Sequence, residues 1–188
     1  MEVRTYFLQG MKETSSSQFI DSSMNPTASR QKTHRVITET TKWCFTEEEL
    51  EPRNQIQYLN NIRTSNILSD KEKLIIKLIN VKILSYKAQD NEKKLYNESL
   101  FVDLKYILCL LLDKYPEPCV CYYCQQPVLI TYIYKNEPRQ WTMERLDNSQ
   151  GHNKGNCVVA CLSCNIRRRT MYHERFLVTK QLKIVKLE

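Results

Sequence analysis

The sequence of 188 residues has little glycine and no long apolar run. It contains only three glycines, well below the roughly 7% of average usage, which argues against a turn-rich β-sandwich or barrel. The longest uninterrupted apolar run covers residues 106–112, about a third of the ~20 residues that span a bilayer. No charged, apolar and small-residue pattern of a secretory signal precedes it. We therefore expect a soluble, intracellular protein without a membrane partner.

The composition excludes global disorder, because 41% of the residues are hydrophobic and 26% are charged. Residues 1–45 differ from the rest, since they are rich in Ser, Thr, Gln and Asn and show no sustained apolar period. We expect this segment to be mostly disordered, with a short strand over residues 3–8. The remaining length fits a helical region over residues 46–98, which could bind a protein partner, and a second domain over residues 99–188.

Two capping boxes mark helix starts in the helical region. Thr46 with Glu49 predicts a helix from about residue 47, and Ser69 with Glu72 predicts one from about residue 70 to Lys87. Serine 99 is expected to cap a third helix that ends before the prolines at 116 and 118.

After these prolines the apolar period changes. Residues 128–134 and 140–146 are rich in Val, Ile, Thr, Tyr and Trp, which predicts two strands, and residues 157–160 predict a short third strand. A helix is expected over residues 161–176. The fold class is therefore α+β, with a helical N-terminal region before a small domain of mixed structure.

Six of the eight cysteines lie between residues 119 and 164, and four of them form two Cys-x-x-Cys units. Cys121 and Cys124 are separated by 36 residues from Cys161 and Cys164, the spacing of a tetrahedral Cys₄ zinc site. A redox pair and buried thiols are the alternatives, and Cys119 or Cys157 could substitute as a ligand. Because four protein ligands leave no open position, such a zinc would be structural, and any hydrolysis would use another metal.

Positive charge lies over the cysteine cluster. Residues 139–188 hold ten Lys or Arg against four Asp or Glu, which accounts for +6 of the total charge of +7. This distribution favours a polyanionic partner, above all nucleic acid, although a solvated basic tail would have the same composition.

Between the cysteine pairs the sequence contains an acidic strand, a loop with Gly151 and Gly155, and an Asn directly after the last cysteine. In these features residues 99–176 resemble the HNH, or ββα-metal, endonucleases, in the zinc-containing branch that includes phage recombination endonuclease VII. Similar small proteins are common in phages and large DNA viruses. The resemblance implies a zinc-stapled ββα-metal domain that hydrolyses phosphodiester bonds in DNA, with branched DNA as one candidate substrate.

The resemblance also implies roles for individual residues. Glu144 occupies the acidic position and Asn165 the helical position, where the family holds a catalytic Mg²⁺ or Mn²⁺ beside the scissile phosphate; both offer oxygen ligands. Asn156 matches an Asn that braces the loop. The family's general base is a His after the acidic residue, and here Arg145 stands in its place.

Arginine stays protonated and cannot accept a proton from water, so Arg145 would be a phosphate clamp. Three replacements for the base remain open: Asp147 as base or metal ligand, His152 from the loop, or a metal-bound hydroxide alone. Strand alternation puts Glu144 and Asp147 on opposite faces, so both reach one metal only if the strand bends.

The remaining basic residues are candidates for DNA binding. The run of arginines at 167–169 is expected in the first turns of the last helix, with Arg175 on the same face as Arg168, a spacing that suits successive phosphates. Lys154 in the loop joins this set. Trp141 and Tyr172 could stack on bases or cover the core around the zinc. The rival interpretation is an inactive nuclease-derived zinc module that binds nucleic acid or a protein.

Overall fold

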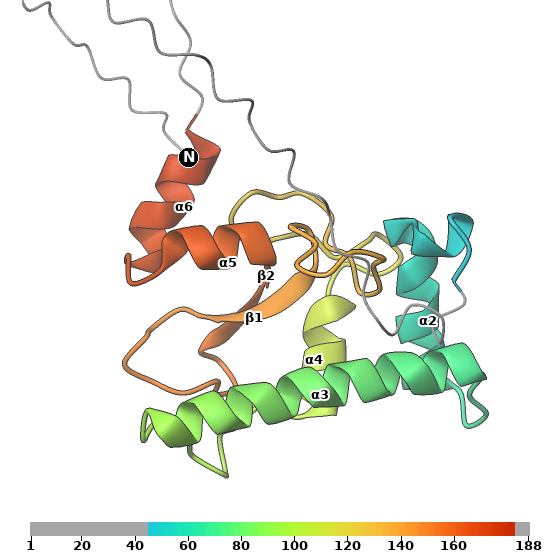
Figure 1. The fold of residues 1–188 in the computed structure, drawn as a ribbon, viewed down its shortest axis with the longest axis horizontal. Helices are drawn as coiled ribbons and strands as arrows, with labels where there is room; N and C mark the ends of the chain where they lie inside the picture. Colours follow the sequence, from blue (N-terminus) through green and yellow to red (C-terminus); the bar gives the residue numbers. More distant parts are fainter. Residues whose placement is uncertain (1–44, 183–188) are drawn as a thin grey trace, which may run out of the picture. The chain divides into compact units, whose positions relative to one another are not determined.

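The computed structural model describes residues 45–182. They form helices and a two-stranded antiparallel sheet (Figure 1). No helix within this described part is long and apolar enough to cross a membrane. The strand and the disorder expected before residue 45 lie outside the described residues. In chain order the elements are η1 (Glu48–Leu50), α2 (Pro52–Thr64), α3 (Asp70–Glu92), α4 (Leu104–Leu111), β1 (Trp141–Arg145), β2 (Cys157–Cys161), α5 (Leu162–Arg168) and α6 (His173–Gln181).

Both predicted capping boxes are present. The Thr46 and Glu49 side chains each accept a hydrogen bond from the other residue's backbone N–H, at 3.3 and 2.8 Å. The helix they begin is only the short 3₁₀ turn η1, and Pro52 then starts α2 at its first position. Ser69 caps α3 as predicted, but α3 continues beyond the expected end at Lys87.

The third helix begins later than expected. Its cap is Asp103, whose carboxylate accepts a hydrogen bond from the Tyr106 N–H at 2.7 Å, so the prediction of Ser99 was wrong. The Ser99 hydroxyl instead donates to the Asn97 side chain at 2.8 Å within the preceding turn. The helix ends at Leu111, before the prolines, as predicted.

The core lies where α2, α3 and α4 meet. Each of these helices buries apolar side chains spaced three or four residues apart, which is the period of one helix face. Trp141 and Met143 of β1 are 1% exposed and belong to the same core cluster. The buried helical residues of this cluster are Ile56, Leu59, Ile75, Ile79, Ile107, Leu108 and Leu111.

The strands predicted near residues 140–146 and 157–160 are confirmed as β1 and β2, paired so that Trp141 faces Cys161 and Glu144 faces Val158. The strand predicted over residues 128–134 was wrong, since this segment makes only isolated bridges. The side chain of Gln55, 1% exposed, makes the hydrogen bonds to this backbone that a neighbouring strand would otherwise make. Its amide oxygen accepts from the Ile130 and Thr131 N–H groups at 2.6 and 3.0 Å, and its Nε2 donates to the Thr131 carbonyl at 3.1 Å.

The helix predicted over residues 161–176 is two helices. The chain breaks at Arg169, which has a φ of 51°, a left-handed conformation that costs a non-glycine residue about 1 kcal/mol or more. The Asn148 side chain donates to the Arg169 carbonyl at 3.4 Å. Phe176 of α6 then packs edge-on against Tyr123, with ring centroids 4.9 Å apart, so α6 covers the first cysteine turn.

Helix α3 holds β1 and the loop after it through three side chains spaced four residues apart. The Lys82 ammonium donates to the Trp141 carbonyl at 2.5 Å, and the Tyr86 hydroxyl accepts from the Met143 N–H at 3.0 Å. Asp90 bonds to the loop at His152. These contacts cross the predicted domain boundary between residues 98 and 99.

Candidate metal centre and adjoining cavity

The four cysteines of the two Cys-x-x-Cys units form one cluster. Their sulfur atoms all lie within 4.8 Å of one another. The Cys124 and Cys161 sulfurs are 3.9 Å apart, much longer than a disulfide bond and close to the ~3.8 Å edge of a tetrahedron with Zn–S distances of about 2.3 Å. Cys121, Cys124, Cys161 and Cys164 are therefore positioned to hold a metal ion, as the sequence predicts.

Two tight turns present these sulfurs. In the first, Gln125 adopts a positive φ of 57° and its N–H donates to the Cys121 carbonyl at 3.0 Å. The Tyr122 N–H donates to the Val159 carbonyl at 2.8 Å, which attaches this turn to β2. In the second turn, Cys161 caps α5, and its sulfur accepts from the Cys164 N–H at 3.4 Å. The start of α5 is thus part of the metal centre.

The thiols of Cys121, Cys161 and Cys164 differ in how readily they lose a proton. The hydrogen bond between Cys121 and Cys161 lowers the pKa of Cys121 and raises that of Cys161, while desolvation raises the pKa of Cys164. Cys121 is therefore the thiol that ionises most readily, and a bound metal would displace the protons of the others. Cys119 and Cys157 lie outside the cluster, and burial raises the pKa of each to about 12. They are expected to remain protonated thiols.

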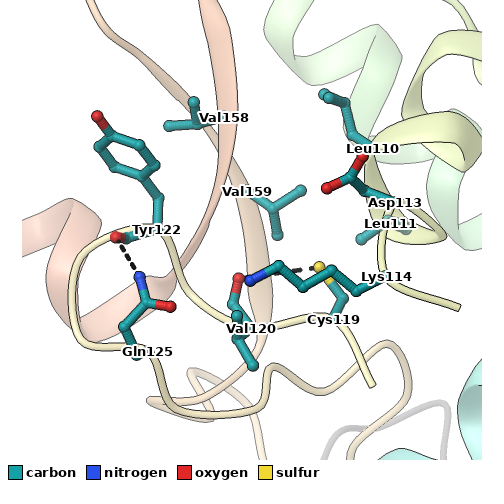
Figure 2. A pocket seen from close by; sticks show the side chains of 10 residues that line it. All are labelled: Leu110, Leu111, Asp113, Lys114, Cys119, Val120, Tyr122, Gln125, Val158 and Val159. Atoms are coloured by element: carbon teal, nitrogen blue, oxygen red, sulfur yellow. Dashed lines mark hydrogen bonds between the residues drawn. The ribbon is translucent and has the colours of Figure 1, made fainter. Parts of the chain in front are cut away.

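Two cavities adjoin the strands, one lined by residues of β2 and the other by residues of β1. The smaller, about 270 Å³, lies between α4 and β2, and Figure 2 shows Cys119 and Val159 on its wall. Its charged lining residues are Asp113 and Lys114, and no imidazole lines it. The larger cavity, about 420 Å³, lies between α3, β1, the loop of residues 146–156 and α5. We call this loop the hairpin loop and this space the polar cavity.

The polar cavity brings together four of the five predicted catalytic residues. Glu144 and Arg145 come from the end of β1, His152 from the hairpin loop and Asn165 from α5. Arg169 and Lys93 add positive charge to its lining. The fifth residue, Asp147, does not line the cavity.

Asp147 is exposed and caps its own turn. Its carboxylate accepts from the N–H and hydroxyl of Ser149 at 2.8 and 2.7 Å and from Gln150 at 3.1 Å. These hydrogen bonds hold the pKa of Asp147 below its ordinary value. Asn156 braces the other side of the loop, accepting from the Asp147 N–H at 2.9 Å and donating to the Gly151 carbonyl at 3.0 Å.

Glu144 forms a buried ion pair with Arg168, whose guanidinium is 1% exposed. The same guanidinium donates to the carbonyls of Arg145 and Leu146 at 2.7 and 2.9 Å. The expectation that Arg168 faces DNA was wrong, because this side chain fastens α5 to the end of β1. Burial raises the pKa of Glu144, and Arg168 opposes that shift.

Asn165 lies one turn before Arg168 on α5. Its Nδ2 donates to the Thr142 hydroxyl at 3.2 Å, and that hydroxyl donates to the Ala160 carbonyl at 2.9 Å. The amide oxygen of Asn165 has no hydrogen-bond partner among residues 45–182, and neither does the second carboxylate oxygen of Glu144. Two oxygen atoms thus remain for a ligand.

The other expected DNA contacts are spread over the surface. Arg167, Arg169 and Arg175 are exposed, but the break at Arg169 removes the single helix face that was to align them. Lys154 is exposed and pairs with Asp103 at 2.7 Å. Trp141 is buried in the core, whereas Tyr172 is 81% exposed, so the expectation of a core role holds only for Trp141.

No family model, curated protein or solved structure matches this chain. The chemistry of the site is therefore inferred from its own residues. Sequence reasoning missed Asp90 and Tyr86, which both contact His152 from α3. Their spacing from Lys82 was the available signal, since residues 82, 86 and 90 share one helix face.

Proposed function

We propose that this chain is a metal-dependent endonuclease of the ββα-metal type, which hydrolyses phosphodiester bonds in DNA. The observation that carries the proposal is the polar cavity, where a carboxylate, an amide and an imidazole meet beside Arg145 and Arg169. The element order supports it, because two antiparallel strands lead directly into a helix that begins at the metal centre.

The donor set fits two different metals in two places. Four thiols with no open position suit a structural zinc ion. The free oxygens of Glu144 and Asn165 suit Mg²⁺ or Mn²⁺, which bind proteins through one or two oxygen ligands and otherwise bind phosphate and water. When bound, such an ion would stabilise negative charge on the phosphate and on the departing oxygen.

The chain's own residues would bind and orient the substrate. Arg145 donates a hydrogen bond to the Gln150 carbonyl at 3.0 Å and lines the cavity with Arg169. Two guanidinium groups can therefore bind one phosphate. Arg168 fixes the Glu144 carboxylate against rotation through its ion pair. Such contacts recognise the backbone and carry no sequence information.

The test is cleavage of plasmid and branched DNA in the presence of Mg²⁺ or Mn²⁺ by the zinc-loaded protein. Asn165→Ala removes a free oxygen and is expected to lower the cleavage rate by at least about 10²-fold, whereas Asn60→Ala on α2 should leave it unchanged. Zinc content and circular dichroism show whether both variants are folded.

If neither the parent nor the variants cut DNA but all bind it with a steep salt dependence, the proposal is wrong. The chain is then a nucleic-acid-binding module, and the ion pair that occupies one oxygen of Glu144 explains the lost chemistry.

A further inference from the structure

The imidazole of His152 is held by a carboxylate from a distant helix. Its Nδ1 lies 2.8 Å from one oxygen of Asp90, and its backbone N–H donates to the other oxygen at 2.6 Å. Both side chains are buried, with 5% of His152 and none of Asp90 exposed. An acidic side chain on α3 therefore fixes both the backbone and the ring of a residue in the hairpin loop.

Two further residues are shaped to this pair. The ring of Tyr86 stacks on the imidazole, with centroids 4.5 Å apart and an interplanar angle of 24°. Gly151 lets the loop approach α3, because a Cβ there would lie 2.5 Å from the Leu95 carbonyl oxygen and 2.8 Å from an Asp90 oxygen. An ion pair on the surface requires neither a stacked ring nor a glycine beside it, so the surroundings of His152 and Asp90 are built to hold this pair.

The pairing decides where the imidazole carries its proton. An ionised carboxylate only accepts hydrogen bonds, so Nδ1 must donate and Nε2 is left as the acceptor. Nε2 has no hydrogen-bond partner among residues 45–182, and His152 lines the polar cavity with Glu144 and Asn165. The proton-accepting nitrogen is thus left free on a residue that lines the cavity where a phosphate would bind.

Burial of the ring is the main cause that favours a neutral imidazole. Burial lowers the pKa of His152; Asp90 on α3 opposes this shift, while Arg145 on β1 and Lys93 beyond α3 reinforce it. A neutral imidazole can accept a proton near neutral pH, which Arg145 cannot do.

We propose that His152 is the general base of the nuclease reaction and that Asp90 is its positioning residue. This inference rests on the proposed function and assigns the role that Arg145 leaves open. A proton of the attacking water passes to Nε2 while the water oxygen bonds to phosphorus. The bond from phosphorus to the sugar oxygen of the leaving strand breaks, that oxygen takes a proton from solvent, and the imidazolium returns its proton to solvent.

The activity test uses three variants of the full chain under the cleavage conditions above. His152→Ala should lower kcat by about 10²- to 10⁴-fold, with partial rescue that rises with added imidazole. Asp90→Asn should lower kcat by at least about 10²-fold at nearly unchanged KM, since the analogous change in a Ser-His-Asp triad costs about 10⁴-fold. Asp70→Asn is the matched control, because Asp70 is also a carboxylate on α3 but is exposed and pairs with Lys73, far along the helix from Asp90; it should leave kcat unchanged.

A second readout is independent of cleavage. Nitrogen-15 NMR of the zinc-loaded protein should show His152 protonated at Nδ1, and Asp90→Asn should lose this single tautomer while zinc content stays the same. A parent that cuts DNA, with His152→Ala cutting equally well, overturns the inference and leaves the proposed function intact. A His152 that carries its proton at Nε2 overturns the inference as well. If the parent cuts no DNA, both the inference and the proposed function are wrong.

Discussion

The ion pair between Glu144 and Arg168 gives the sharpest stability prediction. Arg168→Met removes a guanidinium that is 1% exposed and leaves Glu144, 7% exposed, without its counter-charge. The loss of one partner of a buried pair costs about 3–5 kcal/mol. With a urea dependence of about 2 kcal/mol per molar, the midpoint of unfolding should fall by roughly 1.5–2.5 M.

The double variant separates the ion pair from the packing. In Glu144→Gln/Arg168→Met no charge remains, so the loss should be smaller than that of Arg168→Met alone by about 1 kcal/mol or more. Burial raises the pKa of Glu144, so in Arg168→Met the carboxyl takes up a proton as the pH falls, and the loss should shrink between pH 7 and pH 5. Urea unfolding of the zinc-loaded proteins at both pH values measures this. A loss below about 1 kcal/mol, or one that is equal in the Glu144→Gln background, would refute the reasoning.

Three further predictions concern the metal, acid stability and one turn. Chelation of the metal, or Cys164→Ala, should unfold the chain in circular dichroism, because structural zinc sites contribute about 10–16 kcal/mol, while Cys119→Ala should keep one zinc per chain by elemental analysis. A hydrogen bond from Lys71 lowers the pKa of Glu49 to about 2, below its unfolded value. The contribution of Glu49 to stability is therefore present above about pH 4.5 and disappears toward pH 2. In unfolding experiments Glu49→Gln should destabilise the protein at pH 7 and have no effect in acid. Gly155 has a φ of 86° with open space around it, so Gly155→Ala should cost about 1 kcal/mol of strain in thermal unfolding, and a neutral result would contradict this.

The sequence correctly predicted those parts of the fold and of the metal centre that depend on residues close together in the chain. The capping box at Ser69 and Glu72 placed the start of α3, and the two Cys-x-x-Cys units placed the metal cluster. The β-branched and aromatic residues of β1 and β2 placed the hairpin. The cap and the strands are each set by a few neighbouring residues, and each Cys-x-x-Cys unit is equally short, so these local patterns were sufficient even though the two cysteine units lie 36 residues apart.

The errors arose where a partner lies far along the chain. Residues 128–134 have strand-forming side chains, but Gln55, more than 70 residues away, satisfies their backbone. Arg168 was expected at the surface because nothing nearby in the sequence shows that Glu144 lies opposite it. Asp90 was missed because its partner, His152, is 62 residues away. Pairings of this kind follow from tertiary packing, which local propensity does not describe.

The stripe of Lys82, Tyr86 and Asp90 on α3 also limits how this gene can vary. Insertion of a single residue between Lys82 and Asp90 would turn the end of the helix by about 100° and advance it by about 1.5 Å, which carries Asp90 away from His152. Substitutions on the outward face of the same segment, such as at Leu84 and Ala88, change no such contact. Related genes are therefore expected to differ freely in the exposed residues of this segment while its length between the first and last side chain of the stripe stays fixed.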